Sequence, residues 1–456
     1  MRRETIFALS SGAGRAGVAV IRLSGPQSGA VLNELLGRNS PPKPRHAIYA
    51  PISDPASGER LDDAVAIYFQ GPASFTGEDV VELHVHGGRA VIDGVLDCLS
   101  RQPGLRLAEP GEYTRRAFEN GKMDLTAAEG IADLIDAETA AQRRQAVRQM
   151  AGELGALYES WRARLMKALA HIEADIDFPD EDLPDGIVPV VRGDLAAVYD
   201  DIIAHLADNR RGERLRDGYQ IVILGAPNAG KSSLLNRLAR REAAIVSDIA
   251  GTTRDIIEVH LDLGGFPVTM VDTAGLRDSS DVIESEGVRR ATARAQDADL
   301  RLVVVDRAYW PHIDPETAKL IDSGTVILVN KVDDGAAAAS LPSQWRGQAQ
   351  DGREVELPVL AISAMSGAGM ESLLHHLESR VKEGLDFAGP VPLTRLRHRR
   401  ALEDTSTHLA RGLRSDVAEL AAEDVRLAVR EIGKITGRVD VEDLLDIIFG
   451  DFCIGK

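Results

Sequence analysis

The first part of the chain alternates short apolar runs with glycine and proline. Three runs, over residues 17–23, 64–69 and 80–85, have the residue types of β-strands and are separated by turn-forming residues. From residue 125 the apolar positions follow helical spacing, which continues to about residue 176, with further helix expected over 191–210. We therefore expect an N-terminal α+β domain followed by a helical block.

A different pattern begins at Tyr219. Continuous apolar runs over 221–224, 303–305 and 326–329 predict buried strands, separated by helical signals up to about residue 383. Such alternation is typical of a mostly parallel sheet, and helical spacing then returns over 425–448. The expected fold is multidomain α+β and α/β: an α+β domain over 1–118, a helical domain over 119–214 and 384–456, and an α/β domain over 215–383 inserted into the helical domain.

Composition narrows the class of protein. A length of 456 residues suggests about three domains, and 44% apolar with 27% charged residues is typical of a globular protein. The net charge of −18 argues against indiscriminate binding to nucleic acid or anionic membranes, although a local basic patch could bind RNA. Only Cys98 and Cys453 occur and no apolar stretch reaches membrane-spanning length, so a cytoplasmic protein without a disulfide framework or membrane segment is expected.

A phosphate-binding loop follows the first buried strand of the α/β domain. Residues 225–232 fit the pattern G-x-x-x-x-G-K-[ST], whose backbone N–H groups close on phosphates. Lys231 is expected to reach the β- and γ-phosphates, and the Ser232 hydroxyl to ligate Mg²⁺. A glycine-rich turn without a ligand would have a similar loop, so the assignment depends on later motifs.

Those motifs identify the nucleotide. Residues 251–255 (Gly-Thr-Thr-Arg-Asp) offer a threonine to Mg²⁺ and the γ-phosphate, and residues 272–275 (Asp-Thr-Ala-Gly) follow an apolar run and offer an aspartate to the Mg²⁺ shell. Residues 330–333 (Asn-Lys-Val-Asp) supply a carboxylate that can accept from the two N–H donors on the edge of guanine, which adenine lacks. Ser363 and Ala364 are expected in a second base-contacting loop. In this order the motifs predict a GTPase.

The source of catalytic charge is open. Leu276 stands where signalling GTPases have a glutamine that orients the attacking water. Asn228 could hold a monovalent cation beside the phosphates, or it could only cap the loop. Glu284 could orient water, or it could be a surface glutamate.

The motifs outside this domain give the sequence a resemblance, over essentially its whole length, to the tRNA-modification GTPase family called MnmE or TrmE. The resemblance is carried by residues 74–83 (SFTGEDVVEL), 86–88 (HGG), 110–118 (PGEYTRRAF), 122–125 (KMDL), 225–233 (GAPNAGKSS), 247–255 (SDIAGTTRD) and 452–456 (FCIGK).

This resemblance implies a homodimer formed through the N-terminal domain, which binds 5,10-methylenetetrahydrofolate as one-carbon donor, with 5-formyltetrahydrofolate as an analogue. It implies K⁺-promoted dimerisation of the GTPase domains and a heterotetramer with the flavoprotein MnmG. The pair would add an aminomethyl or carboxymethylaminomethyl group to C5 of the wobble uridine of certain tRNAs.

The resemblance also assigns roles to residues of this sequence. Glu284 would position the hydrolytic water, and Cys453 could act in the modification chemistry. Ser232 and Thr253 would contact Mg²⁺, the K⁺ ligands would be Asn228, Ser247, Ile249 and Thr252, and the folate contacts would be Arg22, Glu82, Lys122 and Lys456. The expected GTP-binding residues are Asn228, Ala229, Gly230, Lys231, Ser232 and Ser233, then Ser247, Asp248, Ile249, Ala250, Gly251, Thr252 and Thr253, then Asp272, Thr273, Ala274 and Gly275, and finally Asn330, Lys331, Asp333, Ser363 and Ala364.

Several features have more than one interpretation. Alternate positions of a strand share a face, so on the strand expected over 80–85 and its continuation the side chains of Glu82, His84 and His86 project from the same side. They could form the wall of a ligand pocket, a polar exposed face or a metal site. Arg115 and Arg116 near Glu112 are expected to form surface ion pairs rather than to anchor a substrate.

The C-terminal tail and the basic stretches are also open. A tail beyond a helix ending near Gly450 is ordered only if it docks, and the thiol of Cys453 could be reactive or merely structural. Basic residues over 143–148, 210–216 and 395–400 could contact tRNA phosphates or balance local acid.

We therefore expect a GTP hydrolase of the EC 3.6 class, whose γ-phosphate and cation order the switch segments and drive a conformational change linked to tRNA modification. A GTP-dependent switch in ribosome assembly or signalling, without tRNA chemistry, is the alternative, because this fold hosts many functions.

Overall fold

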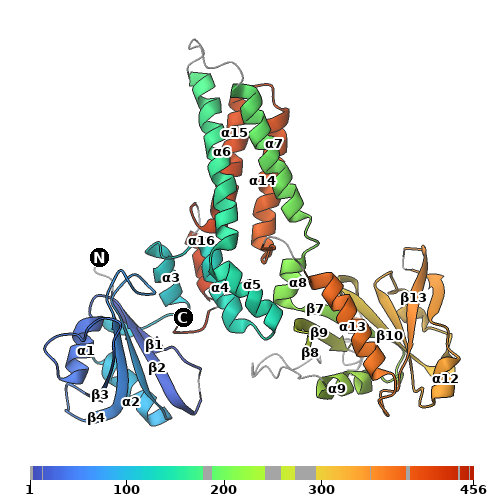
Figure 1. Ribbon diagram of the computed structural model, residues 1–456, viewed down its shortest axis with the longest axis horizontal. Helices are drawn as coiled ribbons and strands as arrows, with labels where there is room; N and C mark the ends of the chain where they lie inside the picture. The colour runs from blue at the N-terminus through green and yellow to red at the C-terminus, as the bar shows by residue number, and fades with distance from the viewer. Residues whose placement is uncertain are drawn as a thin grey trace, which may run out of the picture. The chain divides into compact units, whose positions relative to one another are not determined.

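The computed structural model describes residues 4–12, 14–177, 187–241, 258–272, 294–349, 351–386, 391–439, 442–450 and 452–455 (Figure 1). Contacts divide the chain into two compact units. The first contains Met1–Ala132, Arg148–Tyr199 and Ala401–Lys456, and the second contains Asp133–Val147 and Asp200–Arg400.

A mixed sheet forms the N-terminal part of the first unit. Its strand order is β3-β4-β5-β2-β1-β6, and all neighbours are antiparallel except β1 and β6. The strands are β1 (Thr5–Leu9), β2 (Ala16–Ser24), β3 (Ala47–Ser53), β4 (Arg60–Phe69), β5 (Val80–Gly87) and β6 (Leu105–Leu107). The predicted strands over 17–23, 64–69 and 80–85 are thus confirmed.

The two faces of this sheet have different cover. Helices α1 (Ser28–Leu36) and α2 (Arg89–Ser100) bury one face, because Leu32 and Leu99 pack with Ile21 and Leu83 in one apolar cluster. On the other face, Tyr113 of α3 (Glu112–Glu119) packs against Ile6 and Ala8 of β1. The sheet therefore has a second face, partly covered by α3, on which polar side chains of β2 and β5 lie.

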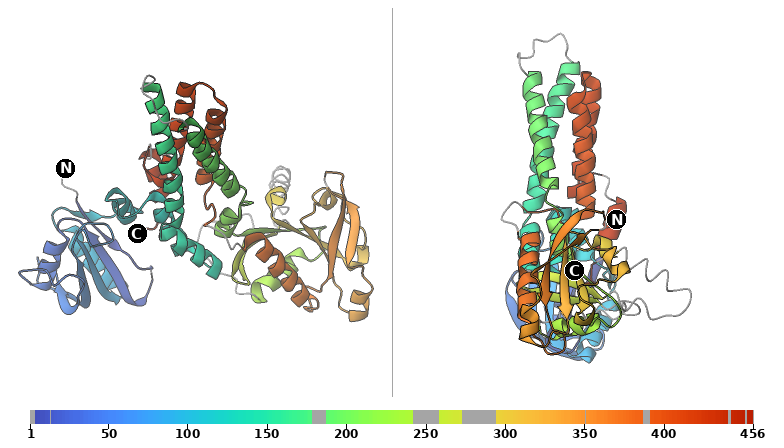
Figure 2. Two further views of the ribbon diagram at one scale, coloured as in Figure 1. Left: turned by 45° about the horizontal axis from the view of Figure 1, so that its top comes forward. Right: turned by 90° about the vertical axis from the view of Figure 1, so that its right-hand side faces the viewer.

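A helical bundle forms the rest of the first unit. Tyr158 and Leu165 of α6, Val198 of α7 and Ile432 of α15 are buried, which is expected of apolar stripes that face one another. Figure 2 shows the long helices side by side. The helices of the helical regions are α4 (Leu125–Asp136), α5 (Ala140–Met150), α6 (Glu153–Asp177), α7 (Ile187–Leu206), α14 (Leu396–Arg414), α15 (Ala418–Thr436) and α16 (Glu442–Gly450).

The second unit contains the α/β fold predicted from residue 219 onward. Its sheet has the order β12-β13-β11-β10-β7-β9-β8, with parallel pairing from β13 to β9 and antiparallel pairing at both edges. The strands are β7 (Tyr219–Leu224), β8 (Glu258–Leu263), β9 (Phe266–Asp272), β10 (Leu300–Asp306), β11 (Thr325–Asn330), β12 (Gln344–Gln348) and β13 (Glu354–Ala361). The predicted mostly parallel sheet is confirmed.

Helices bury this sheet. Leu234 and Leu238 of α9, with Leu373 and Leu377 of α13, pack on one face, and a second apolar cluster around Ile321 covers the other. The helices of this fold are α8 (Arg211–Asp217), α9 (Lys231–Arg241), α11 (Pro315–Ala318), α12 (Gly335–Ala339) and α13 (Met370–Leu385), with the short 3₁₀ helix η2 (Arg307–Tyr309). Among the described helices, none combines the length and apolar character needed to cross a membrane.

Candidate functional site

The loop between β7 and α9 has the backbone that the phosphate-binding motif predicts. Gly225 has φ +140° and Gly230 has φ +100°, values that residues with a side chain rarely adopt. A Cβ atom at Gly225 would lie 2.2 Å from the Val304 carbonyl oxygen, and one at Gly230 would lie 2.1 Å from Asn330 Nδ2. Both positions therefore require glycine, and the loop is a cradle for a phosphate chain.

Lys231 closes this loop. Its buried Nζ donates to the carbonyl oxygens of Gly225 and Ala226, both at 2.9 Å. Asn228 is exposed at the tip of the loop and has φ +62°, a conformation that asparagine tolerates better than most residues. The ammonium group and the carboxamide thus lie on the loop expected to surround the phosphates.

A hydroxyl and a carboxylate meet beside the loop. Ser232 Oγ donates to Asp272 Oδ2 at 2.7 Å, and Asp272 is fully buried at the end of β9. Hard oxygen donors of this kind fit Mg²⁺. Ser232 would ligate the ion, and Asp272 would hold it through this contact or through a bound water.

The base end of the site is joined to the loop by Asn330. Its Nδ2 donates to the Ala229 carbonyl oxygen at 2.7 Å, and its Oδ1 accepts from the Ala364 amide at 2.9 Å. Ser363 Oγ donates to Asp333 Oδ1 at 2.5 Å, which orients the carboxylate expected to recognise guanine. The structure therefore brings together residues from the three motifs over 225–232, 330–333 and 363–364.

Lys331 directly follows Asn330, the last residue of β11. It has φ +65°, and its Nζ donates to Asp306 Oδ2 at 2.6 Å. That hydrogen bond, together with one from the Ala308 amide, lowers the pKa of Asp306. The Lys331 side chain is thus held by a carboxylate that stays ionised at neutral pH.

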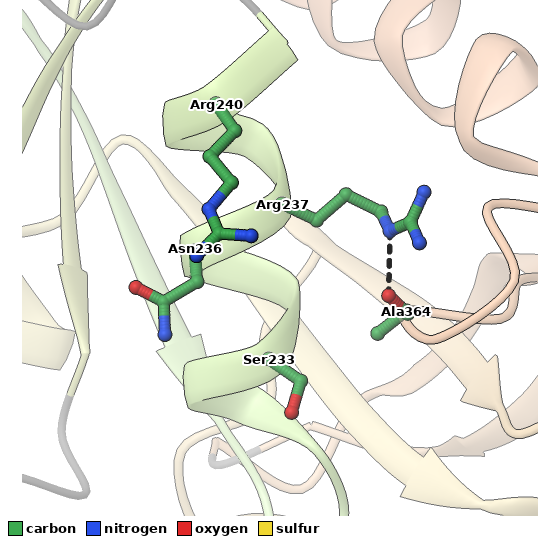
Figure 3. A pocket seen from close by; sticks show the side chains of 5 residues that line it. All are labelled: Ser233, Asn236, Arg237, Arg240 and Ala364. Carbon is green, nitrogen blue, oxygen red and sulfur yellow. Dashed lines mark hydrogen bonds between the residues drawn. The ribbon is translucent and has the colours of Figure 1, made fainter.

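A hollow of about 490 Å³ lies between α9 and the loop that contains Ala364 (Figure 3). It is lined by Ser233, Asn236, Arg237, Arg240 and Ala364. Arg237 reaches across to the Ala364 carbonyl oxygen, a contact that sequence motifs did not identify because Arg237 lies outside them.

Other predicted nucleotide and cation residues lie outside the described residues. They are Ser247, Asp248, Ile249, Ala250, Gly251, Thr252, Thr253, Thr273, Ala274, Gly275 and Glu284. Their expected roles stay predictions.

A second cluster lies on the N-terminal sheet. Arg22 of β2 donates through Nε and Nη2 to Glu82 Oε1 of β5, at 3.1 and 2.9 Å. The Arg22 guanidinium also lies 5.7 Å from the ring centre of Phe75 and 5.8 Å from that of Tyr113, whose hydroxyl donates to the Arg22 carbonyl oxygen at 2.7 Å. The strand register thus brings two predicted folate contacts together, with two aromatic rings that sequence reasoning missed.

The other two predicted folate contacts are placed differently. Lys122 Nζ donates to the Pro72 carbonyl oxygen at 2.9 Å, in the segment that precedes β5. Lys456 lies outside the described residues.

Glu112 lies at the centre of a partly buried ion-pair network in the same domain. It accepts from Arg106 and Arg116, and Arg116 Nη1 also donates to Glu78 Oε2 at 3.0 Å. Arg116 is only 5% exposed, so the expectation of a surface pair is wrong for this residue, because α3 turns Arg116 toward the sheet. Arg115 is partly exposed and pairs with Glu119 and Asp446, as an ion pair near the surface.

The alternation in β5 is confirmed, but its histidines have separate partners. Val81, Leu83 and Val85 are buried, whereas His84 lies 3.5 Å from Glu82 and His86 Nδ1 lies 2.8 Å from Asp62 Oδ1. Among the described residues, no three His, Cys, Asp or Glu side chains form a group that could hold a metal. The interpretation of this face as a polar or ligand-binding wall is favoured.

The C-terminal tail docks on the N-terminal part of the same unit. Ser10 Oγ donates to the Gly455 carbonyl oxygen at 2.9 Å, and Ile454 forms an isolated bridge with Pro110. Phe452 packs against Phe449 of α16 with ring centres 5.6 Å apart. The side chain of Cys453 is exposed, so the tail is held in place while its thiol remains accessible.

Several basic residues are paired within their own unit. Arg395 lies 2.6 Å from Asp133, and Arg399 lies 2.7 Å from Asp208. Further pairs join Arg148 to Glu153, Arg210 to Glu213, Arg214 to Asp299 and Arg216 to Asp133. For these arginines the contacts favour the interpretation that they balance local acid.

Comparison with known proteins identifies the family of the chain. The family model described as the MnmE helical domain matches residues 125–453, and the one described as the GTP-binding protein TrmE N-terminus matches residues 5–122. Proteins called tRNA modification GTPase MnmE from Parvibaculum lavamentivorans and Paramagnetospirillum magneticum are 56% identical over 459 residues and 55% over 454, each match covering 99% of this chain and 100% of the relative. The relative of that name from Rhodospirillum rubrum is 52% identical over 470 residues, with 100% of both chains covered. The chain therefore belongs to the MnmE family of tRNA modification GTPases.

Proposed function

We propose that this protein is a K⁺-dependent GTPase that acts as a homodimer with the flavoprotein MnmG to modify the wobble uridine of certain tRNAs. It would add an aminomethyl or carboxymethylaminomethyl group to C5 of that uridine. The observation that carries the nucleotide part is that Asn330 joins the phosphate loop to the base-contacting loop, while the Ser232–Asp272 pair lies beside the phosphate loop. The proposed domains are those expected from the sequence, with boundaries near residues 118, 214 and 383.

The proposed hydrolysis needs a cation beside the phosphates. Lys231 and the loop amides would hold the β- and γ-phosphates, and Mg²⁺ bound by Ser232 and Thr253 would neutralise charge on them. Asn228 would offer its carboxamide oxygen to K⁺, with Ser247, Ile249 and Thr252 as further ligands. Glu284 would orient the water.

We propose that GTP hydrolysis controls uridine modification by changing the conformation of the protein. β8 follows the segment that contains the Gly-Thr-Thr motif, and β9 leads directly into the Asp-Thr-Ala-Gly motif. The turn between these strands accepts a hydrogen bond at the Gly265 carbonyl oxygen from the Ala141 amide, at 3.0 Å. Ala141 is in the first turn of α5, where helix N–H groups lack intrahelical partners, so the turn and the helix are joined where a nucleotide-dependent shift could be transmitted.

The N-terminal cluster supports the folate part of the proposal. Glu82 offers a carboxylate that can accept from the N–H donors of a pterin ring, and the Arg22 guanidinium, which is paired with it, holds that carboxylate in place. These two side chains therefore fit the pterin of 5,10-methylenetetrahydrofolate, which would supply the one-carbon unit. The docked tail would bring Cys453 to the same domain, where its thiol would act as nucleophile or proton carrier.

The first test is GTP turnover by the full-length protein in matched KCl and NaCl. K⁺ should stimulate turnover strongly in the wild type and not in Asn228→Ala. Asn228→Gly is the matched variant, because glycine adopts φ +62° without strain, so that loss of the side chain is tested without a distorted backbone. Equal turnover in both salts would contradict the cation mechanism.

The folate part has a separate test. Titration of 5-formyltetrahydrofolate should show binding to the wild type, and Arg22→Met should weaken it at least tenfold. Arg89→Met, at an exposed arginine of α2, is the control and should bind normally. Equal binding by Arg22→Met and Arg89→Met would contradict the assignment of Arg22.

A further inference from the structure

Arg237 lies on α9, six residues after Lys231, and its guanidinium contacts the loop over residues 363–369. Nε donates to the Ala364 carbonyl oxygen at 2.6 Å (Figure 3). Nη2 donates to the Met365 carbonyl oxygen. A Cβ atom at Gly367 would lie 2.5 Å from Arg237 Nη1. The guanidinium therefore lies against the backbone of this loop.

The same loop also holds the groups expected to recognise the base. The Ala364 amide donates to Asn330 Oδ1 at 2.9 Å, and Ser363 Oγ donates to Asp333 Oδ1 at 2.5 Å. The Ser366 amide donates to the same Ser363 oxygen at 3.0 Å. A shift of the loop backbone would therefore move Ser363, and with it the carboxylate of Asp333.

The guanidinium suits this task for geometric reasons. Its planar fork offers Nε and Nη2 in fixed directions, so it can hold two successive carbonyl oxygens, and a charged donor makes the stronger hydrogen bonds. Lys231 and Arg237 belong to one regular helix, so six residues set their separation along the axis at about 9 Å. The contact thus fixes the distance between the phosphate loop and the base-contacting loop.

We propose that Arg237 is a positioning residue that sets the base-contacting loop against the phosphate-binding loop and so contributes to selectivity for guanine. It acts through Ser363 and Asp333 and does not touch the reacting atoms. This inference rests on the proposed nucleotide site.

The test compares the binding of GDP with that of IDP, which lacks the 2-amino group that Asp333 is expected to recognise. Calorimetric titrations use the full-length wild type, Arg237→Ala and Arg237→Lys. Arg237→Ala should weaken GDP binding at least tenfold and lower the GDP-to-IDP preference at least threefold. Arg237→Lys should recover part of both, because an ammonium can hold one of the carbonyl groups. The kcat at saturating GTP should stay within threefold of the wild type.

Arg240→Ala is the matched control. Arg240 is on the same helix and lines the same hollow, but it is exposed and makes no hydrogen bond to the described residues of the loop. The GDP affinity and the GDP-to-IDP preference of Arg240→Ala should stay within twofold of the wild type. If Arg237→Ala is unstable, Arg237→Gln allows the same comparison with one carbonyl contact retained.

The outcomes separate the inference from the proposed site. An unchanged GDP-to-IDP preference in Arg237→Ala and Arg237→Gln, with or without a lower melting temperature, would overturn the role of Arg237 and leave the site in place. Failure of the wild type to bind GDP would instead overturn the nucleotide site itself. A lowered preference in Arg237→Ala that Arg237→Lys partly restores would support the inference.

Discussion

The buried carboxylate of Glu112 provides a prediction whose size follows from its hydrogen bonds. Glu112 Oε1 accepts from Arg106 Nη2 at 2.6 Å and from Arg116 Nε and Nη2 at 3.2 and 2.8 Å. Glu112 Oε2 accepts from Arg106 Nη1 at 2.8 Å and from the Glu109 amide at 3.0 Å. Glu112→Gln keeps the shape but replaces one of these oxygens with an amide nitrogen, which cannot accept.

If the amide nitrogen replaces Oε2, Glu112→Gln loses two hydrogen bonds, which is the smaller of the two possible losses. A hydrogen bond from a charged donor is worth roughly 1.5–3 kcal/mol and an amide bond about 1 kcal/mol, so the substitution should cost about 3 kcal/mol of local stability. The same substitution leaves the charges of Arg106 and Arg116 less compensated in a site where Glu112 is only 8% exposed, which adds to the cost. Hydrogen exchange of peptides from α3 should therefore accelerate about 100-fold at pH 7.

Glu119→Gln is the matched control on the same helix. Glu119 is partly exposed and accepts from Arg115 at 3.2 Å, and pairs of this kind contribute about 0–1 kcal/mol. The reasoning would be refuted if Glu112→Gln and Glu119→Gln accelerated exchange of α3 equally at pH 7.

The pH dependence provides an independent check. Burial alone would raise the pKa of Glu112, but hydrogen bonds from Arg106, the Glu109 amide and Arg116 outweigh it and hold the pKa below 4.5. Because the folded-state pKa is lowered, the stabilisation is fully present above pH 4.5 and is lost as the pH falls through the folded value. The difference between wild type and Glu112→Gln should therefore be constant from pH 7 to about pH 5 and shrink below pH 4.5. A difference that shrinks already between pH 7 and pH 5 would assign the effect to another group.

Three further predictions concern the site and the backbone. Asn330→Ala removes two buried hydrogen bonds and should weaken GDP binding by roughly 2–4 kcal/mol in calorimetry, whereas a change below threefold would contradict the bridging role. Gly265→Ala forces a side chain to φ +89° and should lower the unfolding free energy by about 1–2 kcal/mol. Gly193→Ala, in α7, adds a Cβ atom into open space and should raise the unfolding free energy by about 0.5–1 kcal/mol. Chemical denaturation checks both signs. Iodoacetamide at pH 8 should alkylate the exposed Cys453 and spare Cys98, because burial, followed by the nearby Asp54 charge, raises the pKa of Cys98 to about 11, and mass spectrometry showing equal labelling would contradict this.

Local sequence determined much of this protein. The runs over 221–224, 303–305 and 326–329 are buried strands, because a strand covered on both faces needs continuous apolar residues. The phosphate loop could also be predicted, since its glycines and lysine are close together in sequence and their roles depend on local backbone geometry. An edge strand was harder to predict: β12 alternates exposed and partly buried positions and has one large apolar residue, Trp345, so its apolar signal is weak.

Tertiary structure decided which distant residues meet. Arg22 and Glu82 are 60 positions apart and become partners through the register of β2 and β5, and Tyr113 reaches Arg22 only because α3 packs on that face. As a charged residue, Arg116 is expected at the surface. It is buried because the carboxylates of Glu112 and Glu78 pair with its guanidinium. Arg237 acquires its role in the same way: the helix after the phosphate loop brings it to two carbonyl oxygens more than 120 residues away. Hydrophobic periodicity and motifs are local properties of the chain, whereas hydrogen bonds between elements depend on packing and strand order, and so appear only when the chain is folded.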